Sequence, residues 1–315
     1  MRGHCTRSCG LCESKRHQPV ILLSARQAAP CNTSQGEIWV NQARANKQAF
    51  AALWGWQMVW SSELVDPSFV GSWNKLTVLR KLLRDELAAS SNGSAGGWIL
   101  WMDWDVMVTD PEFRLPLVEY EERHVWLVLG GDPKHILVAS PDYLRANTGL
   151  MLLRVHKWSL ALVERMLSKG APHVKRKNAL EAQESVRNLC YGCFDDQAAL
   201  LVLLREQPER WRPHIQLERR FHIQSYWEDI EGAFPRQAKS VTSSTKWPAR
   251  RIPGWPSEAR LLRPVHGHWP VPFAVHFAGC QLCSGKLTDA DRLRRCVRTF
   301  ESVARYAQST KPMTV

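Results

Sequence analysis

Two aspartates separated by one residue, Asp103 and Asp105, directly follow a run of bulky apolar residues from 98 to 102. Breaker residues precede this run and it lacks a helical period, so we expect a central strand that is covered on both faces. The carboxylates then lie at the carboxyl end of the strand, where open α/β sheets bind their ligands. This arrangement suits a hard divalent cation that a nucleotide diphosphate also holds. The alternative is a loop with two solvated aspartates.

Three further polar motifs lie in or at the ends of predicted elements. Asn147-Thr-Gly149 opens an apolar strand, Asp195-Asp-Gln197 opens a helix, and His276 lies in a short apolar segment near the carboxyl terminus. Carboxylates in the first turn of a helix complement its dipole, so capping is the alternative role for both of these aspartates. For the histidine, the alternative is a hydrogen-bonded core residue.

Strands and helices alternate along most of the chain. The predicted strands are 19–24, 56–61, 98–102, 125–130, 147–154 and 272–279, and the predicted helices are 41–55, 70–87, 158–168, 195–206 and 288–306. This order predicts a largely parallel sheet. The segment 208–272 is rich in Pro, Trp and Arg and is expected to be irregular, and residues 309–315 are expected to form a disordered tail.

The composition is that of a globular protein with a basic surface. The 315 residues are 44% hydrophobic and 23% charged, and the formal net charge is +12. The basic residues are scattered and form no nucleic-acid-binding motif, so nucleic acid is not an expected partner. No apolar stretch approaches the roughly 18 residues that a membrane span needs, and the N-terminus has no signal sequence.

The cysteines allow two interpretations. Nine cysteines include three Cys-x-x-Cys pairs, at 9/12, 190/193 and 280/283. Two such pairs could bind zinc in a cytosolic protein, whereas disulfides would indicate an oxidising compartment. The sequons at Asn32 and Asn92 agree with the second interpretation. The spacing leaves open the pairing among Cys31, Cys190, Cys193, Cys280, Cys283 and Cys296.

The first twelve residues end in Cys-x3-Cys-x2-Cys with Ser-Cys-Gly, which resembles the end of a ShK-toxin-like module, a small secreted disulfide domain. The family's three upstream cysteines do not precede them, so our hypothesis is that the chain lacks its true start. We therefore expect a module remnant at 1–12, a linker at 13–18 and a main α/β domain at 19–308.

The order and spacing of the polar motifs resemble glycosyltransferase family 34, which includes plant xyloglucan xylosyltransferases, galactomannan galactosyltransferases and fungal α-mannosyltransferases. The resemblance runs from about residue 19 to residue 308. Besides the motifs above, it includes Asn46-Lys47, the segment 71–80, and Arg154 and Trp158 after the Asn-Thr-Gly turn. It ends with the segment 275–283 around the histidine.

The resemblance implies a GT-A fold, which is an α/β nucleotide-sugar-binding sandwich around one central mixed, mostly parallel sheet. It also implies a retaining, Mn²⁺-dependent enzyme that moves a sugar from a nucleotide diphosphate to a polysaccharide or glycan, usually in an α-1,6 link. UDP-xylose or UDP-galactose is favoured over a mannose donor. The expected location is the Golgi lumen, as a type II membrane protein whose anchor this chain lacks. A homo- or hetero-oligomer with related transferases is one arrangement that the resemblance allows.

Residue roles follow from the same resemblance. Asp103, Asp105 and His276 would hold Mn²⁺, because carboxylate, imidazole and phosphate ligands together suit this ion better than Mg²⁺ or Zn²⁺. The expected catalytic residues are Asp195, Asp196 and Gln197. The expected substrate-binding residues are Asn147, Gly149, Lys75, Arg80, Gly279 and Gln281. For Lys75 and Arg80 a solvated helix face is the alternative.

The developing positive charge on the sugar requires a nearby carboxylate, for which Asp195 and Asp196 are candidates. Retention could use a carboxylate nucleophile or attack on the same face, with the leaving phosphate taking the acceptor proton, and we favour the second.

Two positions depart from the plant members. Trp104 replaces a small residue between the two aspartates, which would crowd the donor site, and Gln281 replaces a lysine that faces the diphosphate. Lys286 or an arginine could supply the lost charge. A weakly active or inactive glycan- or nucleotide-binding relative is therefore one rival hypothesis, and a zinc-structured binding module is another.

Overall fold

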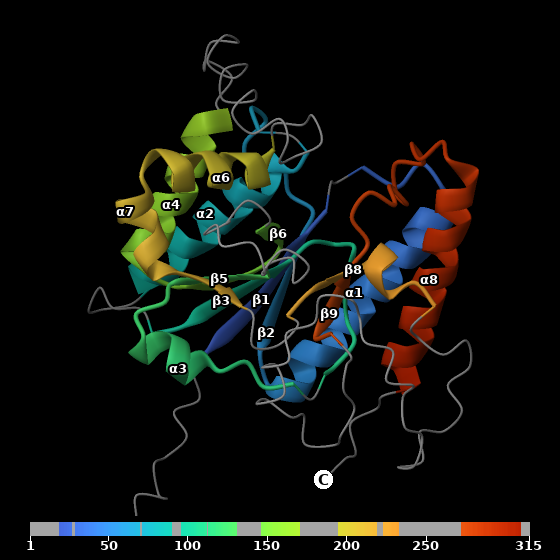
Figure 1. Cartoon of the computed structure of the whole chain (residues 1–315), viewed down its shortest axis with the longest axis horizontal. Coiled ribbons are helices and arrows are strands. Elements are labelled where there is room, and N and C mark those ends of the chain that lie inside the picture. The colour runs from blue at the N-terminus through green and yellow to red at the C-terminus, as the bar shows by residue number, and fades with distance from the viewer. Residues whose placement is uncertain are drawn as a thin grey trace, which may run out of the picture.

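The computed structural model describes residues 19–26, 29–69, 71–89, 96–111, 113–130, 146–170, 195–218, 223–232 and 272–309. A six-stranded sheet forms its centre (Figure 1). In order across the sheet, the strands are β2 (Gln57–Ser61), β1 (Val20–Ala25), β3 (Trp98–Met102), β6 (Asn147–Arg154), β5 (Leu127–Gly130) and β7 (Ile215–Glu218).

The sheet is mixed and mostly parallel. Strand β6 is antiparallel to β3 and β5, and the pairs β2–β1, β1–β3 and β5–β7 are parallel. The predicted α/β architecture around one central sheet of this kind is confirmed. Strand β3 is buried along its whole length, as its continuous apolar sequence predicts.

Successive side chains of the central strands enter two different cores, as the period of a strand requires. Ile99 and Trp101 pack into one hydrophobic cluster, and Trp98 and Leu100 pack into another on the opposite face. The first cluster is covered by helices that lie together on one side of the sheet (Figure 1). These helices are α2 (Trp73–Ala89), α4 (Lys157–Gly170), α6 (Asp196–Glu206) and α7 (Pro208–Trp211).

The other face carries helix α1 (Ser34–Trp54) and a small three-stranded sheet. That sheet has the order β4 (Val106–Val108), β9 (Ala274–His276) and β8 (Ser225–Tyr226). The C-terminal helix α8 (Ala290–Ser309) packs on α1, where the rings of Trp39 and Phe300 stack with centroids 4.9 Å apart. The remaining short elements are α3 (Leu117–Glu122), η3 (Arg212–His214) and η4 (Trp227–Ile230).

Several predicted boundaries were wrong. Helix α1 begins at Ser34 and not at residue 41, because the side chain of Thr33 caps it by accepting a hydrogen bond of 3.0 Å from the amide of Gly36. Strand β4 was not predicted. The described parts of the supposedly irregular segment 208–272 contain α7, β7 and β8, and α8 extends to Ser309.

Two disulfides, Cys31–Cys283 and Cys280–Cys296, join the chain near β9. The pair Cys280/Cys283 is therefore not available to zinc, which removes that part of the zinc-module hypothesis. The other two Cys-x-x-Cys pairs, the ShK-like remnant, the linker 13–18, the sequon at Asn92 and residues 310–315 lie outside the described residues. None of the helices in the described part of the chain has the length and apolar character of a membrane span.

Candidate active site

Asp103, Asp105 and His276 lie together, as a shared metal site requires. The Nε2 atom of His276 lies 3.3 Å from Oδ1 of Asp105 and 3.7 Å from Oδ2 of Asp103. One ligand atom from each of the three residues fits within 4.8 Å of the others. Two carboxylates and an imidazole are a donor set that suits a divalent first-row metal ion.

Strand pairing produces this convergence. After β3 ends at Met102, the chain turns and continues as β4, which pairs antiparallel with β9 so that Val106 lies opposite His276. The amide of Phe277 donates to the carbonyl of Asp105 over 3.0 Å, and that of Asp103 donates to the carbonyl of Gly149 over 2.7 Å. The small sheet and the central sheet therefore meet at the two aspartates.

The charges of the aspartates and of His276 act on one another at short range. Burial acts to lower the pKa of His276, but Asp105 and Asp103 outweigh it and raise that pKa above its usual value. Burial acts to raise the pKa of Asp105, but His276 and Lys47 outweigh it and lower that pKa. The negative charge of the two aspartates, which stabilises a proton on the imidazole, would also stabilise a metal cation bound in place of that proton.

Lys75 is buried in the site and is not on a solvated helix face. Its Nζ atom lies 3.0 Å from Oδ1 of Asp103 and 2.8 Å from Oδ2 of Asp196, and it donates to the carbonyl of Thr148 over 3.1 Å. Burial acts to lower the pKa of Lys75, but Asp103 and Asp196 together raise it. The lysine therefore joins α2 to the turn that carries Asp103 and to the start of α6.

Asn147 and Gly149 shape the turn that opens β6. The Oδ1 atom of Asn147 accepts a hydrogen bond of 2.7 Å from the amide of Gly149. A Cβ atom on Gly149 would overlap Cε1 and Nδ1 of His276. Glycine is thus required here because the imidazole ring occupies the space that a side chain would need.

The three predicted catalytic residues at the start of α6 have different partners. Asp195 caps the helix by accepting from the amide of Ala198 over 2.9 Å, which is the alternative that the sequence left open. Asp196 is buried against Lys75. The Oε1 atom of Gln197 accepts from the amide of Thr148 over 3.3 Å, so α6 is bonded directly to the Asn-Thr-Gly turn.

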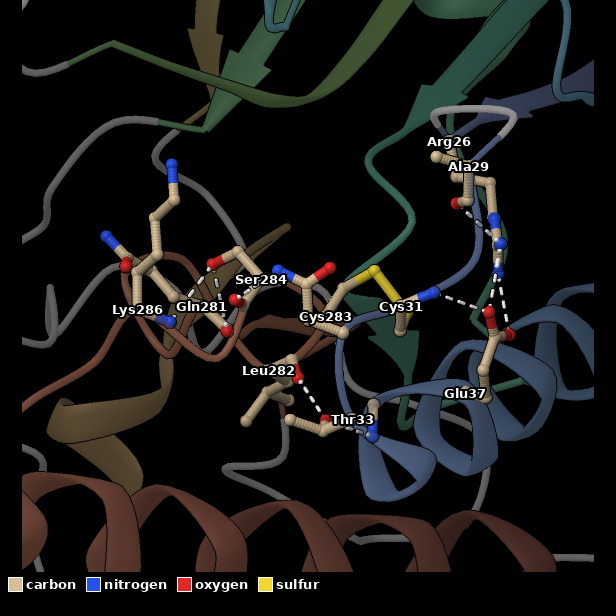
Figure 2. Close-up of a disulfide and its surroundings, with 12 residues drawn as sticks. Arg26, Ala29, Cys31, Thr33, Glu37, Gln281, Leu282, Cys283, Ser284 and Lys286 are labelled. Carbon is tan, nitrogen blue, oxygen red and sulfur yellow. Dashed lines mark hydrogen bonds and ion pairs between the residues drawn. A yellow bond between two sulfur atoms is a disulfide. The ribbon is translucent and has the colours of Figure 1, made fainter.

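The loop after β9 is fixed to the loop before α1. Figure 2 shows the disulfide between Cys31 and Cys283, beside which Thr33 donates from its hydroxyl to the carbonyl of Leu282 over 3.1 Å. Three residues of this loop have left-handed backbone conformations: φ is 76° at Gly279, 48° at Gln281 and 65° at Gly285. Gln281 is exposed, and its carbonyl accepts from the amide of Gly285 over 2.9 Å.

Arg80 and Trp104 have other contacts. The guanidinium of Arg80 lies 3.7 Å from Oδ2 of Asp66, so its ion-pair partner among the described residues lies outside the candidate site. Trp104 is partly buried and packs against the hydrophobic cluster that contains Val275 and Phe277.

Two polar residues beside the site had no predicted role. Lys47 of α1 is buried and donates to the carbonyls of Trp104 and Val106, over 3.1 and 2.6 Å, on either side of Asp105. Burial lowers the pKa of Lys47 to about 7, against the opposing effect of Asp105 and Asp103. The other is Gln224, whose amide lies 3.3 Å from Nδ1 of His276. Asn46-Lys47 was noted only as part of the family resemblance, and nothing in the sequence indicated Gln224.

Comparison with known proteins gives one family. The model of the galactosyl transferase GMA12/MNN10 family matches residues 16–287. The protein described as probable glycosyltransferase 3 of Oryza sativa is 29% identical over 293 residues, which are 92% of this chain and 56% of that protein. Xyloglucan 6-xylosyltransferase 4 of Arabidopsis thaliana is 28% identical over 293 residues, 92% of this chain and 50% of that protein.

Among solved structures, a glycosyltransferase involved in the glycosylation of the major capsid of PBCV-1 is similar to 89% of this chain and 98% of its own, with a TM-score of 0.45 and 12% identity. This chain spans about half the length of the curated relatives that it matches. The family match covers most of the chain and all four motifs that meet at the site, ending just after the disulfide-bonded loop. The chain therefore belongs to the galactosyl transferase GMA12/MNN10 family.

Proposed function

We propose that this chain is the catalytic region of a retaining glycosyltransferase that uses Mn²⁺ and a nucleotide diphosphate sugar. The observation that carries the proposal is the cluster of Asp103, Asp105 and His276, whose ligand atoms come from two distant parts of the sequence. A divalent cation held by these side chains would neutralise charge on the diphosphate as it leaves the sugar.

The residues around the cluster support the same reaction. Asn147 and Gln197 bring amide groups to one turn, where they would bind sugar or acceptor hydroxyls. Asp196 would supply negative charge beside the developing oxocarbenium ion, and Asp195 orders the helix that carries it. We favour attack on the same face of the sugar, because the ion pair with Lys75 makes the carboxylate of Asp196 a weaker nucleophile.

The finer assignment depends on the relatives. One of them is named a xyloglucan 6-xylosyltransferase, which supports UDP-xylose as donor, a polysaccharide or glycan as acceptor and an α-1,6 link. UDP-galactose is the second donor that we propose. The disulfides support an oxidising compartment, and with the family resemblance we assign the protein to the Golgi lumen.

A screen of nucleotide sugars tests the proposal. Purified intact protein is incubated with UDP-xylose, UDP-galactose or GDP-mannose, with and without Mn²⁺, and release of nucleoside diphosphate is measured. We expect Mn²⁺-dependent release from a UDP-sugar, abolished in Asp103→Asn and Asp105→Asn. The matched control is Asp85→Asn on the exposed face of α2, which should retain full activity. Equal turnover in all three variants would refute the metal site.

A second candidate is a weakly active or inactive relative that binds the nucleotide or glycan. Gln281 favours it, because this position has no positive charge to offer a diphosphate. In that case UDP would still bind, whereas release from every donor would stay at the background rate. Gln281→Lys would then raise turnover, and Lys286→Ala would leave it unchanged.

A further inference from the structure

The side chain of Gln224 contacts the nitrogen of His276 that faces away from the aspartates. Gln224 immediately precedes β8, which runs parallel to β9 with Tyr226 opposite His276. The glutamine is 8% exposed and the histidine 5%. Its amide Nε2 and the imidazole Nδ1 are 3.3 Å apart, and its Oε1 has no hydrogen-bond partner among the described residues.

A buried amide with an unpaired oxygen is costly, by about 1–3 kcal/mol, and such groups in folded proteins usually have a reason. The two ends of a glutamine amide have nearly the same shape, so either can face the imidazole. If Nε2 faces it, Nδ1 must accept, and the proton of a neutral imidazole lies on Nε2. If Oε1 faces it, Nδ1 carries the proton, and the lone pair lies on Nε2.

The position of the aspartates decides between these orientations. Nε2 of His276 is the nitrogen that faces Asp103 and Asp105, so a metal ion shared by the three residues needs the lone pair there. Metal-binding histidines generally donate their second ring N–H to a neighbouring acceptor, which fixes both tautomer and ring orientation. Gly149 packs against the same ring and limits its rotation. The second ring nitrogen of His276 is Nδ1, and the side chain in contact with it is that of Gln224.

We propose that Gln224 is a positioning residue, whose Oε1 accepts a hydrogen bond from Nδ1–H of His276 and so holds Nε2 toward the metal ion. This inference depends on the proposed metal site. Gln224 does not itself touch the ion or the substrate, and its effect is on the affinity for the ion.

The test compares Gln224→Met, which fills the space without an acceptor, with Gln224→Glu, which offers only acceptors. Mn²⁺ affinity of the full chain is measured by electron paramagnetic resonance of the free ion, and thermal unfolding checks the fold of each variant. We expect Gln224→Met to weaken Mn²⁺ binding about 10- to 100-fold, the range found when such an acceptor is lost. Gln224→Glu should bind Mn²⁺ at least as tightly as the unmodified chain.

Each other outcome overturns the inference in a distinguishable way. If Gln224→Met binds Mn²⁺ normally while Asp105→Asn does not, the metal site stands and Gln224 has no positioning role. If Gln224→Glu is as weak as Gln224→Met although both fold, the amide donates to His276 and the proposed orientation is wrong. If the unmodified chain binds no Mn²⁺, the metal site and the role of Gln224 fail together.

Discussion

The ammonium group of Lys75 and the carboxylate of Asp196 form an ion pair of 2.8 Å, in which the side chains are only 7% and 4% exposed. The same ammonium group lies 3.0 Å from Asp103. One lysine thus balances a carboxylate that we assign to metal binding and another that we assign to the reacting sugar. Because both carboxylates contact the ammonium group of Lys75, a shift of one of them would also displace the other.

Lys75→Met should strongly destabilise the fold. It leaves the buried carboxylate of Asp196 without its partner, and breaking a buried pair in this way costs about 3–5 kcal/mol. Urea unfolding measures the loss. The control is Lys81→Met, six residues further along the same helix, whose pair with Glu63 is exposed and screened by solvent, so that its loss should cost far less stability. A Lys75→Met variant as stable as Lys81→Met would contradict the account of the buried pair.

Gly149→Ala should displace His276 and weaken metal binding. The added methyl group overlaps the imidazole ring, and overpacking of this kind costs about 1–3 kcal/mol. The affinity for Mn²⁺ and the midpoint temperature of thermal unfolding should both fall. At Gly96 an added Cβ meets nothing within 4 Å, so Gly96→Ala is the matched control and should change neither quantity. Normal Mn²⁺ affinity in Gly149→Ala would show that the ring can move without loss.

Lys47→Met should weaken Mn²⁺ binding although Lys47 is not a ligand. The substitution removes the hydrogen bonds to the carbonyls of Trp104 and Val106, which fix the backbone around Asp105. Leaving such buried acceptors unpaired costs about 1–3 kcal/mol each. Titration calorimetry with Mn²⁺ and UDP would measure the change in affinity. An unchanged affinity, together with a lower stability, would mean that Lys47 stabilises the fold but has no effect on the metal site.

The ion pair between Arg26 and Glu37 should make the stability of the fold depend on pH in the acidic range. Hydrogen bonds from Arg26 and from the amide of Cys31 lower the pKa of Glu37 to about 2, from 4.5. A lowered carboxyl pKa contributes stability that is fully present above the unfolded value, near pH 4.5, and is lost as the pH falls toward 2. Urea unfolding of Glu37→Gln should therefore differ most from the unmodified chain at pH 5 and least near pH 2. A difference that stays constant across this range would rule out the pair as its cause.

The sequence predicted the elements with strong local patterns. The continuous apolar run of β3 and the motif at the start of β6 identified the strands and the turn residues at their ends. The C-terminal helix was predicted to begin at residue 288, and the carboxylate of Asp289 accepts from the amides of Asp291 and Arg292. In each case neighbouring residues carry the information.

Long-range contacts explain what the sequence could not predict. The first turns of α1 are stabilised by contacts with the loop after β9, where a Cβ on Gly36 would lie 2.5 Å from the carbonyl of Leu282. Strand β4 has only three residues and exists through its pairing with β9. The meeting of His276 with Asp105 depends on that pairing, so only the family resemblance suggested it. The burial of Lys75 likewise depends on carboxylates from two distant segments.

The central claim is that Asp103, Asp105 and His276 hold one divalent cation that also binds a nucleotide diphosphate. Anomalous scattering at the manganese absorption edge, from crystals grown with Mn²⁺ and UDP, tests it most directly. The account predicts one strong peak within coordination distance of all three side chains and of the diphosphate oxygens. A peak located elsewhere, or UDP bound with no peak beside His276, would contradict it.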